Sequence, residues 1–254
     1  MIAPVFSRPE DWKAARAAMD PLGLKVGFVP TMGALHAGHR SLLERARAEN
    51  DCVVLSVFVN PTQFEDPGDL KRYPRTLGAD LKLAEGLVDC VLAPDPGLMY
   101  PDDYRYRMTE YTLSTRLEGA QRPGHFEGVL TVVLKLLNLV RPHRAYFGEK
   151  DWQQLQLVTG MVKALFLPVE IVPCPTVRDP DGVALSSRNA RLSSSARARA
   201  AAFPRILRES AEASAAARAL DNAGFGVDYV EDLDGVRLGA VRLEDVRLID
   251  NVRI

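Results

Sequence analysis

The sequence predicts an α/β fold, with a doubly wound, Rossmann-like parallel sheet in the N-terminal domain and a small α+β domain at the C-terminus. Short apolar runs alternate with segments of helical periodicity over the first two thirds of the chain, which is typical of such a sheet. Residues 53–59 form a continuous apolar run, the pattern of a strand buried on both faces. After Leu192 an Ala- and Arg-rich segment begins, which indicates a second domain.

The elements of the first domain follow in a regular order. Residues 7–10 read Ser-Arg-Pro-Glu, a capping-box pattern that predicts a helix to about Met19. Apolar runs predict strands over residues 26–29, 53–59, 90–93, 144–147 and 169–172. Helical periodicity covers residues 39–49, 77–85, 128–140 and 151–165. The third of these segments is apolar on nearly all faces, so we expect a buried helix there.

The expected domains are residues 1–177 and residues 178–254. In the second, residues 193–220 predict helices interrupted by Pro204. The remaining segments predict short strands with intervening turns, over residues 226–231 and 236–249.

Composition narrows the class of protein. A chain of 254 residues with 47% hydrophobic and 26% charged residues is typical of a globular protein. The net charge of −1 gives no sign of a nucleic-acid partner. The N-terminus has no secretory signal pattern, and the most apolar run, residues 128–140, falls short of the roughly 20 residues that span a bilayer. Three widely spaced cysteines predict buried free thiols, and we expect a cytoplasmic protein without membrane contact.

Residues 30–39, Pro-Thr-Met-Gly-Ala-Leu-His-Ala-Gly-His, carry the most specific signal. They join a predicted strand to a predicted helix, where free backbone N–H groups and the helix dipole favour an anion. His36 and His39 add donors for phosphate oxygens. The pattern resembles the His-x-Gly-His arrangement of HIGH-type nucleotidyl-transferring α/β enzymes and suggests attack on the α-phosphate of ATP. The alternative is that two histidines lie close together by coincidence.

Two further segments suit phosphate. Lys150 follows Gly148 at a second strand-to-helix junction, although this motif taken alone fits a solvated surface lysine better. Asp151 beside it fits a helix N-cap. Ser186, Ser187 and Arg188 offer hydroxyl and guanidinium donors, although by themselves they fit an ordinary loop. The three segments together predict a phosphate cradle.

Polar groups also follow the second predicted strand and precede the buried helix. Asn60 and Gln63 place uncharged amides where hydroxyl and carboxylate oxygens of a substrate can bind, and Asn60-Pro61 is also a strand-ending turn. Residues 118–126 hold an acid, a base and His125 in a short stretch, which alternatively fits a charged surface loop.

Six collinear motifs resemble those of the pantothenate synthetase (pantoate–β-alanine ligase) family. They read PTMGALHAGH, VFVNPTQF, YPRT, RPGHFEGVLTVVLKLLNLVRP, YFGEKDWQQL and TVRDPDGVALSSRN, and a weaker echo covers residues 246–251. The resemblance implies condensation of pantoate with β-alanine in two steps. Pantoate attacks the α-phosphate of Mg-ATP, which gives pantoyl adenylate and pyrophosphate, and β-alanine then displaces AMP to give pantothenate.

The resemblance also implies site residues. The catalytic set is His36, His39, Lys150, Ser186, Ser187 and Arg188. The ATP contacts are these six with Pro30, Thr31, Met32, Gly38, Gly148, Glu149, Asp151, Val177 and Leu185. Pantoate contacts are Met32, Gln63 and Gln154. Contacts with β-alanine, or support for that pocket, are Asn60, Gln63, Tyr73, Glu118 and Arg122.

The resemblance further implies Mg²⁺ with ATP, a homodimer, and a C-terminal domain that acts as a lid. Two positions depart from the family pattern. Leu185 replaces the common Met, with similar apolar volume. Ala79-Asp80 stands where adjacent acids can occur in the family, so we expect no metal ligated by the protein. Whether Asp80 alone contacts a metal is left open.

Two other functions compete. An adenylyl- or cytidylyltransferase acting on a small phosphate ester uses the same His-x-Gly-His chemistry but needs no amine pocket. A non-catalytic nucleotide-binding protein would leave the set of charged groups unexplained.

Overall fold

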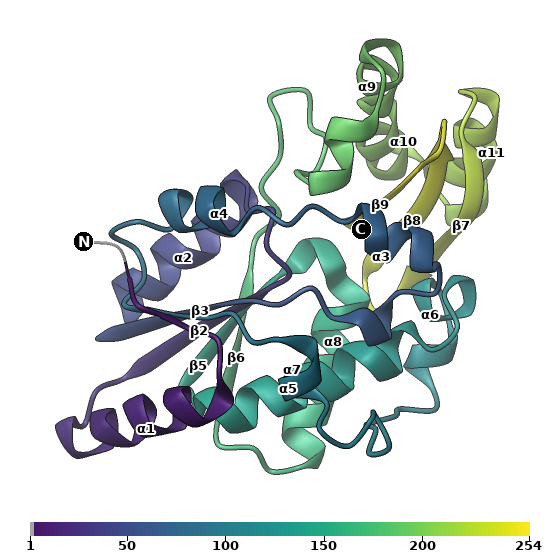
Figure 1. Cartoon of the computed structure of the whole chain (residues 1–254). Helices are drawn as coiled ribbons and strands as arrows, with labels where there is room; N and C mark the ends of the chain where they lie inside the picture. The colour runs from purple at the N-terminus through teal and green to yellow at the C-terminus, as the bar shows by residue number, and fades with distance from the viewer. Residues whose placement is uncertain (1–2) are drawn as a thin grey trace. The chain divides into compact units, whose positions relative to one another are not determined.

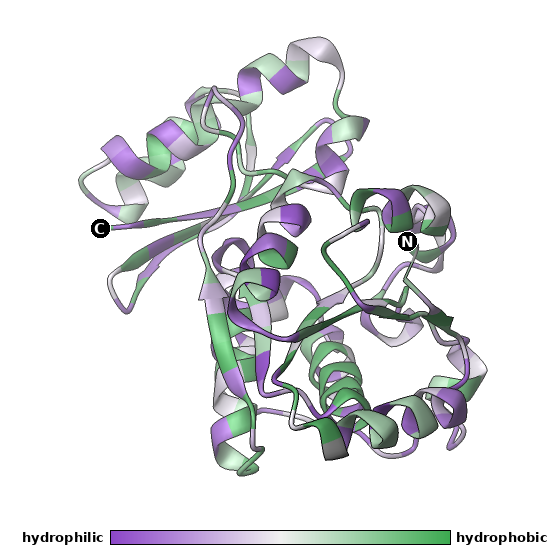
Figure 2. Ribbon diagram, turned by 90° about the vertical axis from the view of Figure 1, so that its left-hand side faces the viewer, coloured by the Kyte–Doolittle hydropathy of each residue, from purple (hydrophilic) through white to green (hydrophobic). Residues whose placement is uncertain are grey.

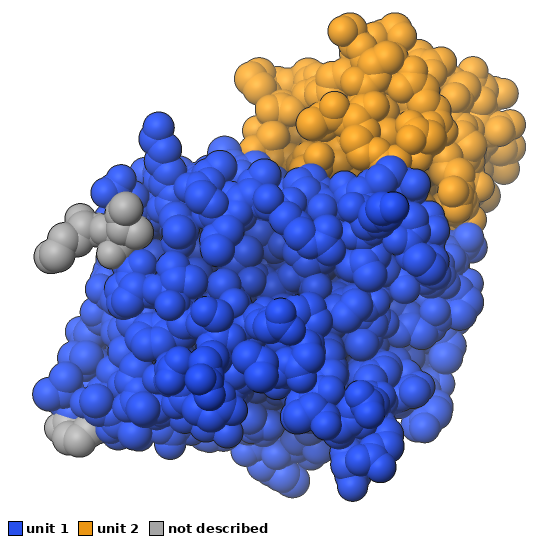
Figure 3. Space-filling model, viewed as in Figure 1, with its two compact units in different colours: residues 1–148, 153–174 blue, residues 149–152, 175–254 orange. Residues whose placement is uncertain are grey.

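The computed structural model describes residues 3–254, with backbone alone at Pro21. It has two compact units, distinguished by colour in Figure 3. Unit 1 comprises residues 1–148 and 153–174, and unit 2 comprises residues 149–152 and 175–254.

Unit 1 is built on a six-stranded parallel sheet in the order β1-β4-β3-β2-β5-β6. The strands are β1 (Val5–Phe6), β2 (Val26–Thr31), β3 (Cys52–Val57), β4 (Cys90–Leu92), β5 (Arg144–Gly148) and β6 (Glu170–Cys174). The principal helices are α1 (Pro9–Met19), α2 (Ala37–Glu49), α4 (Leu77–Leu83), α7 (His125–Val140) and α8 (Trp152–Ala164). Shorter helical segments are α3 (Pro67–Arg72), α5 (Pro96–Met99), α6 (Glu118–Gln121) and η2 (Pro61–Gln63), and the turn η4 (Glu149–Asp151), which precedes α8 in the chain, belongs to unit 2.

The sheet is covered on both faces, as Figure 1 shows. Alternate side chains of each strand point to opposite faces, so that Phe28 joins a core with α1, α7 and α8, whereas Val29 joins a core with α2 and α4. Hydrophobic residues concentrate on the strands in Figure 2. Since β2 and β3 are parallel neighbours, the loops that follow them leave the same edge of the sheet.

Unit 2 contains an antiparallel sheet and three helices. The sheet has the order β7-β8-β9, formed by β7 (Gly226–Leu233), β8 (Val236–Leu243) and β9 (Val246–Arg253). The helices are α9 (Ser194–Ala200), α10 (Ala202–Glu209) and α11 (Ala213–Asn222). Phe203, Leu207 and Leu220 from the helices are buried with Val241 and Leu248 of the sheet.

The predicted α/β class is confirmed, and the ends of the predicted elements lie within four residues of the observed ends. Two local predictions are wrong. The first is the capping box at residues 7–10: the predicted helix α1 is present, but it begins at Pro9 after Arg8, and no side chain caps it. Pro9 at the first helical position has no N–H to satisfy. Pro204 does not interrupt a helix, because it lies in the first turn of α10, where proline is tolerated, and the break falls at Ala201.

The three cysteines are buried free thiols, as predicted. Burial raises the pKa of Cys90 to about 12 and raises that of Cys52. Among residues 3–254, no helix is long and apolar enough to cross a membrane.

Candidate active site

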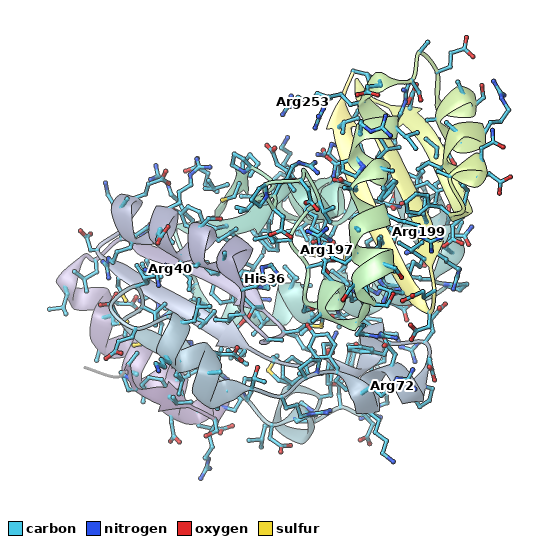
Figure 4. The ribbon with its side chains drawn as sticks, turned by 90° about the horizontal axis from the view of Figure 1, so that it is seen from above. His36, Arg40, Arg72, Arg197, Arg199 and Arg253 are labelled. Atoms are coloured by element: carbon cyan, nitrogen blue, oxygen red, sulfur yellow. The ribbon has the colours of Figure 1, made fainter. Side chains whose placement is uncertain are left out.

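The loop between β2 and α2 places two histidines side by side at the start of the helix. His36 is the N-cap of α2, and its Nδ1 accepts a hydrogen bond from the backbone N–H of Gly38 at 3.1 Å. The backbone N–H of His36 in turn donates to Nδ1 of His39 at 3.3 Å. The ring centroids are 4.1 Å apart. The two imidazoles therefore form a reciprocal capping box, and Figure 4 shows His36 one turn before Arg40 on this helix.

These hydrogen bonds fix the tautomer of both rings. Because each Nδ1 accepts from a backbone N–H, it carries no proton, and the neutral imidazole holds its proton on Nε2. Each ring thus presents an N–H donor on the side away from the backbone of the helix start. Two such donors from one rigid turn suit oxygens on which negative charge increases during a reaction.

Three backbone N–H groups of the loop before α2 are engaged within the protein. Gly33 N donates to Thr31 Oγ1 at 3.2 Å, while Ala34 N and Leu35 N donate to the carboxylate of Asp80 at 3.2 and 2.8 Å. Asp80 is only 2% exposed and also accepts from Thr76 Oγ1 at 3.3 Å. These backbone donors are thus engaged within the protein.

Asp80 also explains the conformation of the loop. Gly33 and Ala34 both have positive φ, 82° and 52°, and the chain then turns the successive N–H groups of Ala34 and Leu35 toward one acceptor, the carboxylate of Asp80. A Cβ at Gly33 would lie 2.9 Å from Asp80 Oδ2, so only glycine fits there. Because both carboxylate oxygens of Asp80 are engaged by the loop, this residue is bound into the fold as an anchor of the histidine loop.

The amides that follow β3 differ in how they are used. Asn60 is 1% exposed, and its Nδ2 donates to Gln63 Oε1 at 3.0 Å and to Gly128 O at 3.2 Å. Its Oδ1 accepts from Tyr100 OH at 2.6 Å. Gln63 Nε2 donates to Met32 Sδ at 3.1 Å, which brings two of the predicted pantoate residues together. Asn60 therefore orients Gln63, and its own amide is fully engaged within the protein.

Arg122 and His125 brace the same turn. Nδ1 of His125 donates to the backbone carbonyl of Gln63 at 2.9 Å, and Arg122 Nη1 donates to His125 Nε2 at 3.0 Å. Arg122 Nη2 adds a longer hydrogen bond of 3.3 Å to the same carbonyl. Tyr73, which like Arg122 was predicted to contact β-alanine, packs its ring edge-on against Phe64, with 5.6 Å between the ring centroids. Arg122 thus supports the turn that carries Gln63.

The two neighbouring glutamines of α8 differ in their hydrogen bonding. Gln153 is 3% exposed; its Nε2 donates to Leu113 O and Arg116 O, and its Oε1 accepts from the backbone N–H of Glu118 at 2.9 Å. Gln154 is half-buried and, within the described part of the chain, its amide makes no hydrogen bond. Gln154 is therefore the one of the two whose amide is available to a ligand.

Within unit 2, Lys150 lies in the short turn η4. Its Nζ is 3.6 Å from Asp151 Oδ1, and its side chain is 18% exposed. The backbone carbonyls of Glu149 and Lys150 both accept from Asn251 Nδ2 of β9, each at 2.9 Å. One side chain of the last strand thus holds the backbone that carries Lys150.

A second segment of unit 2 carries the predicted serines and arginine. Residues 177–185 fold back on themselves at Gly182, with Leu185 N donating to Val177 O at 3.0 Å. The guanidinium of Arg178 pairs with both carboxylate oxygens of Asp250 at 2.7 and 2.9 Å. Ser186 then caps a short helical turn, with its Oγ accepting from Arg188 N at 3.2 Å.

Four residues of these networks were missed in the sequence: Asp80 as an anchor, Gln153, Asp250 and Asn251. The first lies in a position that was considered only for metal binding, and the last two lie in the weaker echo at residues 246–251. Among residues 3–254, no group of three or more His, Cys, Asp or Glu side chains is arranged to hold a metal ion.

Comparison with known proteins agrees with the motifs. The family model described as pantoate-beta-alanine ligase matches residues 4–253. The chain is 56% identical to a pantothenate synthetase of Bdellovibrio bacteriovorus over 98% of this chain and 99% of that one. It is 49% identical to one of Legionella pneumophila over 97% and 98% of the two chains. A crystal structure of pantoate-beta-alanine ligase from Francisella tularensis, complexed with beta-gamma ATP and beta-alanine, has a TM-score of 0.93 at 39% identity and covers 99% of this chain and 97% of that one.

Proposed function

This chain belongs to the pantoate–β-alanine ligase family and catalyses the ATP-dependent condensation of pantoate with β-alanine, and we propose that the reaction passes through pantoyl adenylate. The observation that carries the proposal is the tautomer of the histidine pair. Two neutral Nε2–H donors on one rigid turn can follow the charge that develops when a carboxylate attacks the α-phosphate. No side chain has to bond covalently to the substrate, so catalysis rests on orientation and charge stabilisation.

ATP is assigned to three segments. His36 and His39 donate to phosphate oxygens, and the loop of residues 30–38 supports them. Lys150 adds a cation, with the nucleotide also touching Gly148, Glu149, Asp151 and Val177. Hydroxyl and guanidinium donors come from the segment Leu185, Ser186, Ser187 and Arg188. The half-buried state of these last residues suits donors that meet a ligand.

Pantoate is assigned to Met32, Gln63 and Gln154. The hydrogen bond from Gln63 to Met32 and the unengaged amide of Gln154 support this assignment. For β-alanine, the predicted contacts divide into two kinds. Asn60 and Arg122 act by holding the turn of Gln63, whereas Gln63, Tyr73 and Glu118 stay as proposed contacts.

The proposal extends to the metal ion, the oligomeric state and the role of the C-terminal domain. Mg²⁺ enters bound to the phosphates of ATP, since the described residues offer no carboxylate cluster for it and Asp80 is engaged by backbone N–H groups. We also propose a cytoplasmic homodimer whose C-terminal domain, residues 178–254, acts as a lid.

Pyrophosphate release tests the proposal. Purified protein with Mg-ATP and pantoate, and no β-alanine, should release about one equivalent of pyrophosphate per site. Addition of β-alanine should then give AMP and pantothenate. ADP with orthophosphate would instead mean an acyl-phosphate route, and pyrophosphate release that depends on a phosphate ester would indicate a nucleotidyltransferase.

A further inference from the structure

We propose that Asn251, on the last strand of the chain, is a positioning residue for Lys150 in the adenylate-forming step. The proposal rests on the assignment of Lys150 to ATP made above. Asn251 is separated from Lys150 by 101 positions in the sequence, yet its side-chain nitrogen donates to the backbone carbonyls of Glu149 and Lys150 at 2.9 Å each. Both acceptors are carbonyl oxygens, so the amide nitrogen must be the atom that faces them.

The hydrogen bonds hold the backbone of a short turn between the end of β5 at Gly148 and the start of α8 at Trp152. The turn η4 has only three residues, Glu149–Asp151, too few for a helix to stabilise itself. Two adjacent carbonyls bound by one nitrogen set the direction of the Cα–Cβ bond of Lys150. The ammonium lies at the end of a long side chain, so a small rotation of this backbone moves it by an ångström or more.

Asn251 is itself held firmly. Its backbone lies in β9 opposite Leu238 of β8, and its carbonyl accepts from Arg178 Nη2 at 3.1 Å. The preceding residue, Asp250, is 4% exposed and pairs with Arg178 through both carboxylate oxygens. Arg178 also donates to Gly182 O at 3.0 Å. Adjacent residues of β9 therefore fix two segments assigned to ATP, the Lys150 turn and the fold-back that leads to Ser186.

The strand offers a matched control. Arg253, labelled in Figure 4, also reaches the turn, but its Nη2 lies 3.7 Å from Glu149 Oε1 and its side chain is 85% exposed. A solvated ion pair of this kind contributes little. Removal of Arg253 changes the charge beside the turn and leaves the two carbonyls bound.

The experiment measures single-turnover pyrophosphate release from Mg-ATP and pantoate for the wild type, Asn251→Ala, Arg253→Ala, Lys150→Ala and the double variant Lys150→Ala/Asn251→Ala. Asn251→Ala should slow this step by about 10- to 100-fold, the effect of a misplaced catalytic group, while Arg253→Ala stays within about 2-fold. The double variant should be no more than about 2-fold slower than Lys150→Ala, because Asn251 acts through Lys150. The reaction of supplied pantoyl adenylate with β-alanine should be unchanged in Asn251→Ala.

Contrary outcomes separate the two proposals. Fully additive losses in the double variant, or an equal loss in both half-reactions, would make Asn251 a residue of general stability and overturn the inference. A normal first step in Asn251→Ala would also overturn it. If the alanine variant does not fold, Asn251→Asp keeps the size of the side chain, removes both donors and should show the same slow step. A wild type that releases no pyrophosphate contradicts the proposed adenylate itself, independently of Asn251.

Discussion

Replacing Asp80 by alanine is expected to loosen the loop that presents the histidine pair. The carboxylate is 2% exposed and accepts from two consecutive backbone N–H groups, those of Ala34 and Leu35. A hydrogen bond to a charged group contributes about 1.5–3 kcal/mol, so the pair contributes about 3–6 kcal/mol. Because Ala34 and Leu35 are half-buried and water can reach part of the loop, we expect the lower end, about 3 kcal/mol.

The loss should be visible in stability and in rate. For a chain of this size, about 3 kcal/mol corresponds to a fall in Tm of about 6–12 °C. Pantoate-dependent pyrophosphate release should slow by about 10- to 100-fold, since His36 follows the loop directly. Thermal unfolding followed by circular dichroism and a single-turnover assay on the folded variant measure the two effects.

Asp66 provides the control for this substitution. It caps α3 by accepting from Gly68 N at 2.7 Å, but its side chain is 62% exposed. Asp66→Ala should cost about 1 kcal/mol, as for an ordinary helix cap, and leave the rate of pyrophosphate release unchanged. An Asp80→Ala variant with the Tm and the rate of the Asp66→Ala variant would refute the reasoning.

Three further predictions follow from the site and the core. Replacing His36 or His39 by alanine should slow adenylate formation by about 10²–10³, measured in a single turnover, and an unchanged rate in both variants would remove the pair from catalysis. Gln154→Ala should raise the pantoate concentration needed for pyrophosphate release with little change in Tm, whereas Gln153→Ala should lower Tm. The reverse pattern would contradict the assignment of Gln154 to the ligand and of Gln153 to the fold. Burial raises the pKa of Cys90 to about 12 and raises that of Cys52, so their thiolates are scarce at pH 8. A thiol reagent should therefore react slowly with the native protein, and three equivalents of the reagent should react after denaturation. Rapid reaction of the native protein would contradict this burial.

The parts that the sequence predicted are those with a local signal. Continuous apolar runs mark the strands buried on both faces, so β2 to β6 were placed within a few residues. The His-x-Gly-His loop was recognised because its strand-loop-helix context is local too. The start of α2 at Ala37 was not predicted, because a histidine took the place of the usual Ser, Thr, Asp or Asn at the N-cap.

The missed residues act over long separations in the sequence. Asp80 bonds to a loop 45 positions earlier, Gln153 to Glu118 35 positions earlier, and Asn251 to Glu149 102 positions earlier. No periodicity or spacing reports such contacts, since they depend on how the strands bring the loops together. Arg122 was predicted at a substrate, and its bonds to His125 and the carbonyl of Gln63 instead favour a bracing role.

The central claim is that the pantoate carboxylate attacks the α-phosphate of ATP. Pantoate labelled with ¹⁸O in both carboxyl oxygens tests it directly, because the oxygen that forms the new bond to phosphorus stays there when β-alanine displaces AMP. After a complete reaction, mass spectrometry should find one ¹⁸O in AMP, one in pantothenate and none in pyrophosphate. Label in orthophosphate, or AMP without label, would contradict the account.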